Sequence, residues 1–286
     1  MRTLRWEFYN VKADDAWTLY PLGDIHLGAA TCDEKLLAHD IQAIADDPRG
    51  LWVGMGDMCD WINQSDPRFN VGCLADWLVN KHSLADLAGA ERERFVQMVE
   101  PIAGKCIGLL AGNHETAIQK HYERAIYNEI VTNVKTTGGF EPDRALALGY
   151  HGWLQLAFYH GPDKKGGSHV LRVSLHHGFT GGRLAGGKAL AMQRWLWSHD
   201  ADLVLMGHSH NIDTDVAAVY GIDKAGHHVE YVRKGAFTGT YLRSVSDQGT
   251  DTYAEVKGYM PAAVGGIQVL LHPMAKYQPQ RVRIVA

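Results

Sequence analysis

Six short apolar runs, each as long as a buried β-strand, alternate along the chain with longer stretches of helical periodicity. The apolar runs cover residues 17–22, 50–55, 106–111, 154–160, 171–175 and 202–206. The helical stretches cover residues 33–47, 76–100, 116–134 and 186–200. This alternation favours an α/β sheet covered by helices, and the segments "VEYVRKGAF", "GGIQVLLHP" and "RVRIVA" predict a β-rich end.

The length of 286 residues, without internal repeats or long linkers, predicts a single domain over 1–286. Within it we expect a helical excursion around 73–100 and a β-rich part around 211–286. No apolar run approaches the ~20 residues that span a bilayer, and the first residues lack a secretory apolar region. Four scattered cysteines indicate reduced thiols. These features predict a cytoplasmic protein without a membrane partner.

Composition narrows the classes of ligand. A net charge of -4 argues against a protein that coats nucleic acid by charge alone. The chain has an unusually large number of histidines, 16 in all. Imidazole is a common ligand of transition metals. The histidine content is therefore a first indication of a transition-metal site.

Five of the apolar runs end directly in a motif rich in metal ligands. The motifs are "GDIHLG" (23–28), "GDMCD" (56–60), "GNHE" (112–115), "HHG" (176–178) and "GHSH" (207–210). One Asp-x-His pair alone is more often a turn than a site. Because ligands gather at the carboxyl ends of strands in open α/β sheets, five such ends can converge on one crevice.

The motifs supply seven candidate donors, more than one metal ion needs. They are Asp24, His26, Asp57, Asn113, one histidine of the pair 176 and 177, His208 and His210. Mixed oxygen and imidazole donors suit Mn, Fe, Zn, Co or Ni better than calcium. We predict two divalent ions, with Mn first among the candidates and Asp57 as the bridging carboxylate. His176 is preferred to His177 because it directly continues the strand "RVSL".

The order D-x-H, G-D-x-x-D, G-N-H-E, H and G-H-x-H resembles the calcineurin-like metallophosphoesterase superfamily, from Gly23 to His210. The resemblance implies a four-layer α/β/β/α sandwich of two mixed sheets flanked by helices. It assigns one metal to Asp24, His26, Asp57 and His210, and the other to Asp57, Asn113, His176 and His208. His114 matches the catalytic histidine of the family, which protonates the leaving oxygen or stabilises phosphoryl charge. Glu115 matches an acid expected to hold the loop geometry.

These assignments predict a metal-dependent phosphoesterase that hydrolyses a phosphodiester with a metal-bridging hydroxide. A DNA nuclease and a phosphomonoesterase with the same metals are alternatives. A non-catalytic, metal-stabilised interaction module is a third alternative, against which the intact His114 speaks. The expected partner is a phosphoester substrate, with nucleotides and nucleic acids as candidates, and the sequence leaves the oligomeric state open.

Two further features concern substrate and ligand geometry. The glycine-rich, basic segment "FTGGRLAGGKALAMQR" offers Arg183 and Lys188 as phosphate-binding residues, with a surface turn as an equally weighted alternative. Asp60 could orient a histidine ligand, or could cap a helix or face solvent.

Overall fold

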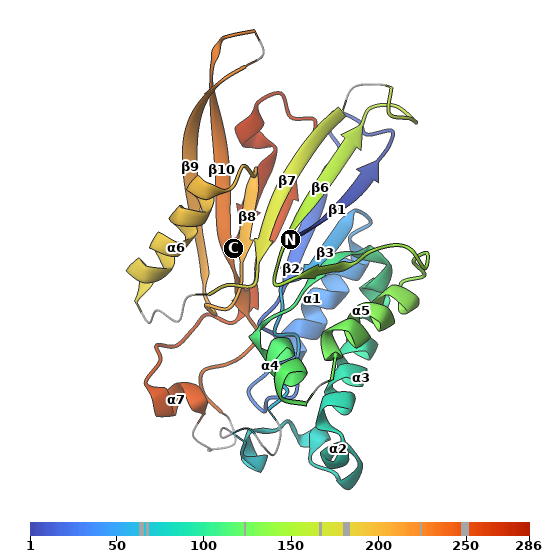
Figure 1. Cartoon of the computed structure of the whole chain (residues 1–286), viewed down its shortest axis with the longest axis vertical. Coiled ribbons are helices and arrows are strands. Elements are labelled where there is room, and N and C mark those ends of the chain that lie inside the picture. The colour runs from blue at the N-terminus through green and yellow to red at the C-terminus, as the bar shows by residue number, and fades with distance from the viewer. Residues whose placement is uncertain are drawn as a thin grey trace.

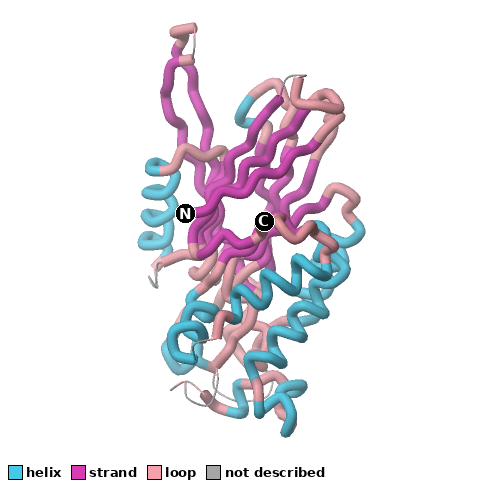
Figure 2. Tube along the Cα trace, turned by 45° about the vertical axis from the view of Figure 1, so that its right-hand side comes forward, coloured by secondary structure: helices cyan, strands magenta, loops and turns pink. Residues whose placement is uncertain are grey.

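The structure is a computed structural model that describes residues 1–62, 66, 69–122, 124–165, 168–179, 184–223, 225–246 and 252–286. Two mixed β-sheets pack face to face, and helices cover the outer face of each sheet (Figures 1 and 2). The predicted four-layer α/β/β/α sandwich is thereby confirmed. No helix within these ranges is long and apolar enough to cross a membrane.

Sheet A has the strand order β1-β6-β7-β8-β10-β11, with β9 paired to β10. Its strands are β1 (Arg2–Phe8), β6 (His151–Tyr159), β7 (Ser168–His176), β8 (Leu203–Met206), β9 (Ile212–Ile222), β10 (His228–Thr240) and β11 (Gly265–Gly266). The central strands β7, β8 and β10 run parallel to one another. The hairpin of β9 and β10 extends as an arm beyond the rest of the sheet (Figure 1).

Sheet B has the order β13-β12-β2-β3-β4-β5. Its strands are β2 (Trp17–Leu22), β3 (Gly50–Gly54), β4 (Cys106–Leu110), β5 (Ala147–Gly149), β12 (Gln268–Leu271) and β13 (Val282–Val285). Strands β2 to β5 are parallel, whereas β12 is antiparallel to both of its neighbours. The carboxyl ends of β2, β3 and β4 therefore lie side by side at one edge.

A continuous apolar core joins the two sheets. Val53 and Ile107 of sheet B are in the same buried cluster as Val173 and Leu205 of sheet A, each at most 1% exposed. Side chains alternate between the two faces of a strand, so every second residue of these strands enters the core. Burial of this shared face is what fixes the two sheets against each other.

The helices are α1 (Glu34–Asp46), α2 (Lys81–Ala85), α3 (Leu87–Val99), α4 (Asn113–Tyr122), α5 (Ile126–Thr137), α6 (Ala185–Ser198) and α7 (Tyr253–Lys257). On the outer face of sheet B, Ile41 of α1, Phe95 of α3 and Ile130 of α5 pack in one cluster with Trp52 and Leu109. On sheet A, α6 packs Met192 and Leu196 in a cluster with Phe237.

The six predicted strands are all present, but two predicted helices are each divided. The stretch 76–100 breaks at Asp86, whose carboxylate accepts a hydrogen bond from the Gly89 amide at 2.9 Å and so caps the start of α3. The stretch 116–134 divides into α4 and α5. Because α3 packs its apolar side chains into the core, this part of the 73–100 excursion is a covering helix.

Candidate metal centre

The five ligand-rich motifs lie at the carboxyl ends of β2, β3, β4, β7 and β8. The first three strands are parallel neighbours in sheet B, and the last two are parallel neighbours in sheet A. Among the described residues, their side chains form three overlapping groups that could hold a metal ion, in each of which the ligand atoms lie within 4.8 Å of one another. The groups are Asp24–His26–His210, His26–Asp57–His114 and Asp57–His177–His208.

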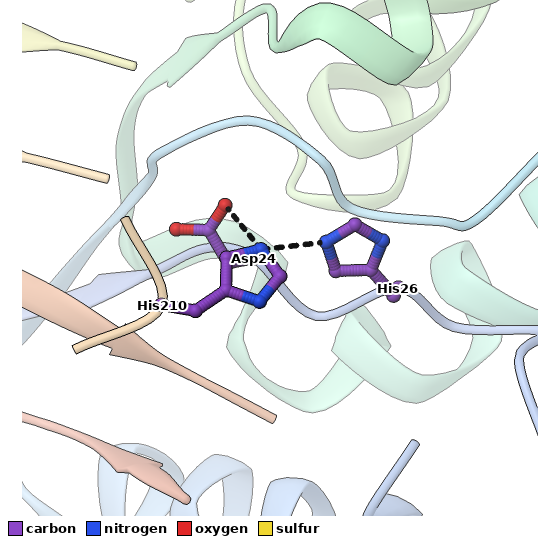
Figure 3. Close-up of side chains that lie close together, drawn as sticks. All are labelled: Asp24, His26 and His210. Atoms are coloured by element: carbon purple, nitrogen blue, oxygen red, sulfur yellow. Dashed lines mark hydrogen bonds and ion pairs between the residues drawn. The ribbon is translucent and has the colours of Figure 1, made fainter. Parts of the chain in front are cut away.

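The first group joins sheet B to the loop after β8 (Figure 3). The Nε2 atoms of His26 and His210 lie 3.2 Å apart, and His210 Nε2 is 3.6 Å from Asp24 Oδ1. Asp24 Oδ1 is buried and has no hydrogen-bond partner within the described part of the chain. Burial raises the pKa of Asp24 to about 8. A buried carboxylate oxygen that faces two imidazole nitrogens and lacks a partner is a donor set that fits a divalent cation.

The third group, Asp57–His177–His208, centres on His177. Its Nε2 lies 3.3 Å from Asp57 Oδ2 and 3.0 Å from Asn113 Oδ1. Its Nδ1 lies 2.8 Å from the Met55 carbonyl, which can only accept a hydrogen bond, so Nδ1 carries a proton and Nε2 faces the cluster. Metal-binding histidines are commonly oriented in this way by a carbonyl on the other ring nitrogen.

Asp57 belongs to both the second and the third group. Its Oδ2 is 4.0 Å from His26 Nε2 and 3.3 Å from His177 Nε2, and its Oδ1 accepts a hydrogen bond from the His114 amide at 2.9 Å. Burial by itself would raise the pKa of Asp57, but the neighbouring histidines, His177 foremost, hold it well below its ordinary value. The structure thus keeps a carboxylate ionised at the point that both groups share.

The structure places His177, and not the predicted His176, in the cluster. The physical reason is the alternation of side chains along β7: Val173 and Leu175 face the core between the sheets, and residue 177 continues on that side. His176 points to the opposite face, where its ring packs against Trp195 of α6 with centroids 4.6 Å apart. Its Nδ1 accepts a hydrogen bond from the Gly178 amide at 2.7 Å. The prediction of His176 as a ligand is corrected accordingly.

The ligand loops carry an unusual amount of backbone strain. Seven residues other than glycine have positive φ angles within the described ranges, and five of them are candidate ligands. These five are Asp24 (47°), His26 (50°), Asp57 (50°), His208 (67°) and His210 (50°). Such conformations cost on the order of 1 kcal/mol or more per residue and persist only when surrounding contacts impose them. Strain concentrated at one cluster of ligands indicates a functional site.

Glu115 supplies part of this support, as the sequence predicts. Its carboxylate accepts hydrogen bonds from the amides of Asp57 and Met58 at 3.0 Å each and of Gly112 at 2.8 Å. The side chain is buried, and burial together with the charge of Asp57 raises its pKa to about 7. Glu115 therefore ties the loop after β3 to the loop after β4.

Asp60 and His114 are held in a small network beside the first group. Asp60 Oδ1 lies 3.0 Å from His26 Nδ1, which is the orienting contact expected for a histidine ligand. The Asp60 carbonyl accepts a hydrogen bond from His114 Nδ1. The His114 ring is 8% exposed and meets the His26 ring edge to face, with centroids 4.7 Å apart. Because Nδ1 carries a proton toward Asp60, exchange of a proton with a substrate falls to Nε2.

Three residues that sequence reasoning missed also position the site. The Asp24 carbonyl accepts hydrogen bonds from Thr240 Oγ1 at 2.7 Å and from the Tyr241 amide at 3.1 Å. Glu91 of α3 is fully buried, and its Oε2 accepts a hydrogen bond from the Trp61 amide at 2.8 Å. These contacts join segments far apart in the sequence, so no local pattern signals them.

We expect Thr240→Val to weaken metal binding roughly 10- to 100-fold, because the strained Asp24 backbone loses a buried hydrogen bond that orients a ligand. The free energy of unfolding should fall by about 1 kcal/mol. Manganese titration and denaturant unfolding measure the two effects. Thr238→Val is the matched control: Thr238 is buried two residues earlier on β10, and its hydroxyl donates a hydrogen bond to the Met206 carbonyl at 3.5 Å instead of to the Asp24 loop. Equal losses of metal affinity in both variants would contradict the expectation.

The two predicted substrate residues have different outcomes. Arg183 lies outside the described residues. Lys188 of α6 is partly buried, and its Nζ donates a hydrogen bond to the Ser209 carbonyl at 2.7 Å, between the candidate ligands His208 and His210. This contact ties α6 to the ligand loop, and a role for Lys188 in substrate binding stays a prediction.

No family model and no curated protein matches the chain. Among solved structures, wild-type Vps29 from Entamoeba histolytica complexed with Zn²⁺ is 9% identical, with a TM-score of 0.34, and the match covers 88% of this chain and 84% of that chain. A conserved uncharacterised protein from Streptococcus pneumoniae, described as a predicted phosphoesterase, is 9% identical with a TM-score of 0.31 and coverages of 91% and 84%. A double mutant of Vps29 from Entamoeba histolytica is 10% identical, with a TM-score of 0.34 and coverages of 93% and 96%.

Proposed function

We propose that this chain is a phosphoesterase of the calcineurin-like metallophosphoesterase type, which hydrolyses a phosphodiester at a centre of two divalent cations. The observation that carries the proposal is the position of Asp57, whose Oδ2 lies 4.0 Å from His26 Nε2 and 3.3 Å from His177 Nε2. One set of ligands would be Asp24, His26, Asp57 and His210. The other would be Asp57, Asn113, His177 and His208.

The donor chemistry favours manganese, with iron, zinc, nickel and cobalt as further candidates. Both sets mix imidazole nitrogen with carboxylate or carboxamide oxygen, whereas calcium prefers oxygen throughout. Cations held there would supply positive charge that polarises a phosphoryl group and acidifies a water molecule. Asp24 Oδ1, which lacks a hydrogen-bond partner among the described residues, supports the presence of a cation, because a cation would favour the ionised form of a carboxyl group whose pKa burial otherwise raises to about 8.

His114 would act as the proton donor to the leaving oxygen. The hydrogen bond from Nδ1 to the Asp60 carbonyl fixes the His114 ring, and the neighbouring His26 ring packs against it edge to face. The Asp57 carboxylate accepts a hydrogen bond from the His114 backbone amide. This contact fixes the position of the proton donor relative to the shared ligand. A positioned acid of this kind contributes about 10²- to 10⁴-fold to a rate.

His114→Gln should therefore lower kcat according to the leaving group. For a diester with an alkyl leaving group we expect a loss of about 10²-fold or more, because the alkoxide needs a proton as it departs. For a p-nitrophenyl diester the loss should be smaller, since p-nitrophenolate is a stable anion. Rates on both esters at saturating Mn²⁺, with metal content measured in parallel, test this role. Equal losses on the two esters would show that His114 does not protonate the leaving oxygen.

The experiment that tests the function is hydrolysis of bis-p-nitrophenyl phosphate beside p-nitrophenyl phosphate. The protein is stripped with a chelator, and Mn²⁺, Ni²⁺, Zn²⁺ or Mg²⁺ is then added back. We expect hydrolysis that depends on the added metal and prefers the diester. Preference for the monoester would instead indicate a phosphomonoesterase. Turnover of neither ester with any metal would overturn the proposal and favour a metal-stabilised interaction module.

A further inference from the structure

A cavity of about 540 Å³ opens beside the candidate metal centre, at the carboxyl ends of β4 and β5. Its lining includes Ala111, which directly precedes the Gly112–Asn113 ligand loop. It also includes Tyr150, whose ring meets the ring of the candidate ligand His177 with centroids 5.2 Å apart. Thr116, a third lining residue, donates from its hydroxyl to the Gly112 carbonyl at 2.7 Å. The cavity and the metal centre therefore share a wall.

Polar side chains without a protein partner converge on this cavity. Four lining residues have side chains that make no hydrogen bond or ion pair within the described part of the chain. They are Arg2, Gln119, Asn128 and Tyr150. They come from β1, α4, α5 and the turn before β6, so they approach from separate elements. Convergent polar groups in a cavity next to reactive side chains are typical of a ligand subsite.

The chemistry of the lining limits the ligand. Among the described residues, no carboxylate side chain lines the cavity, so the described lining offers no counterion to a cationic ligand. The carboxamides of Gln119 and Asn128 each offer both donors and an acceptor, which matches the edge of a heterocyclic base. Tyr150 adds an aromatic ring, and aromatic rings stack on bases. A long alkyl chain would leave these polar groups unpaired, which opposes its binding.

We propose that this cavity binds the nucleoside group of a nucleotide phosphodiester whose phosphate lies at the metal centre. The inference rests on the proposed function, and it names the substrate class of the same site. Arg2 would meet the ribose or a further phosphate, while Gln119 and Asn128 would hydrogen-bond the base. The cavity would then select substrates by the group attached to phosphorus, and the metal centre would set only the reaction.

Two diesters with the same leaving group test the proposal: thymidine 5′-(p-nitrophenyl phosphate) and methyl p-nitrophenyl phosphate. With Mn²⁺-loaded protein we expect kcat/KM for the thymidine ester to exceed that for the methyl ester by about tenfold or more, because the nucleoside gains several hydrogen bonds. Gln119→Ala and Asn128→Ala should each reduce this ratio several-fold. Both side chains are exposed at the cavity, so their replacement removes no core packing.

Asn133→Ala on the same helix as Asn128 is the matched control, because Asn133 does not line the cavity. A second readout is the affinity of thymidine 5′-monophosphate for Mn²⁺-loaded protein, which the two cavity variants should weaken and the control should not. Equal kcat/KM values for the two esters would overturn the subsite and leave the proposed function standing. Hydrolysis of neither ester with any metal would overturn the proposed function itself.

Discussion

Asp57→Asn should lower kcat/KM for bis-p-nitrophenyl phosphate by about 10³-fold or more at saturating Mn²⁺. Loss of a residue that merely orients a ligand costs about 10- to 100-fold, and Asp57 is placed to be a ligand of both cations. Its Oδ2 faces His26 and His177, so an amide in its place removes negative charge from both groups at once. Steady-state kinetics, together with circular dichroism to show that the fold is retained, measure the effect.

Asp60→Asn provides a graded control for this substitution. Asp60 contacts His26 Nδ1 at 3.0 Å but is not a member of the three groups. An asparagine oxygen can still accept that hydrogen bond, so the expected loss stays within about 100-fold. If Asp57→Asn retained activity within tenfold of the wild type, Asp57 would not be the shared ligand.

The second large effect distinguishes two adjacent histidines. His177→Ala should remove a ligand whose Nε2 faces Asp57 and Asn113, and should reduce kcat/KM by at least about 100-fold with loss of bound metal. His176→Ala should keep the metal, because its ring faces Trp195 on the other side of the sheet. Its cost is lost packing, about 1–3 kcal/mol of the free energy of unfolding.

The pair is measured by kinetics, metal content and denaturant unfolding on the same preparations. The account predicts opposite profiles: activity and metal lost in His177→Ala, and stability lost with metal retained in His176→Ala. The reverse assignment, with metal lost only in His176→Ala, would restore the sequence prediction and contradict the side-chain directions along β7.

Sequence reasoning predicts most of the residues that the structure brings together, because their signals are local. An Asp, Asn or His directly after an apolar run predicts a ligand at a strand end, and the parallel neighbours β2, β3 and β4 bring three such ends together. The side-chain period of strand β7 also distinguishes His176 from His177. In "LRVSLHH", Leu171, Val173 and Leu175 define the core face, and the period of two places residue 177 on it.

Other features of the site depend on contacts that a linear pattern does not contain. Thr240 donates a hydrogen bond to the Asp24 carbonyl, although the two residues are 216 positions apart in the sequence. Glu91, on a covering helix, accepts a hydrogen bond from the Trp61 amide. The positive φ angles of the ligands likewise arise from the contacts around each loop, since Asp and His seldom favour that conformation alone. The division of the 76–100 stretch follows from the Asp86 cap, a signal that the sequence does contain, because Asp is a preferred N-cap residue.

The most direct measurement of the central claim is the number of metal ions bound per chain. The protein is stripped with a chelator, reloaded with Mn²⁺, freed of excess metal and examined by inductively coupled plasma mass spectrometry, with Asp57→Asn and His177→Ala beside the wild type. The account predicts two ions per wild-type chain and fewer in each variant. One ion or none in the wild type, or two in all three proteins, would contradict a dinuclear centre built around Asp57.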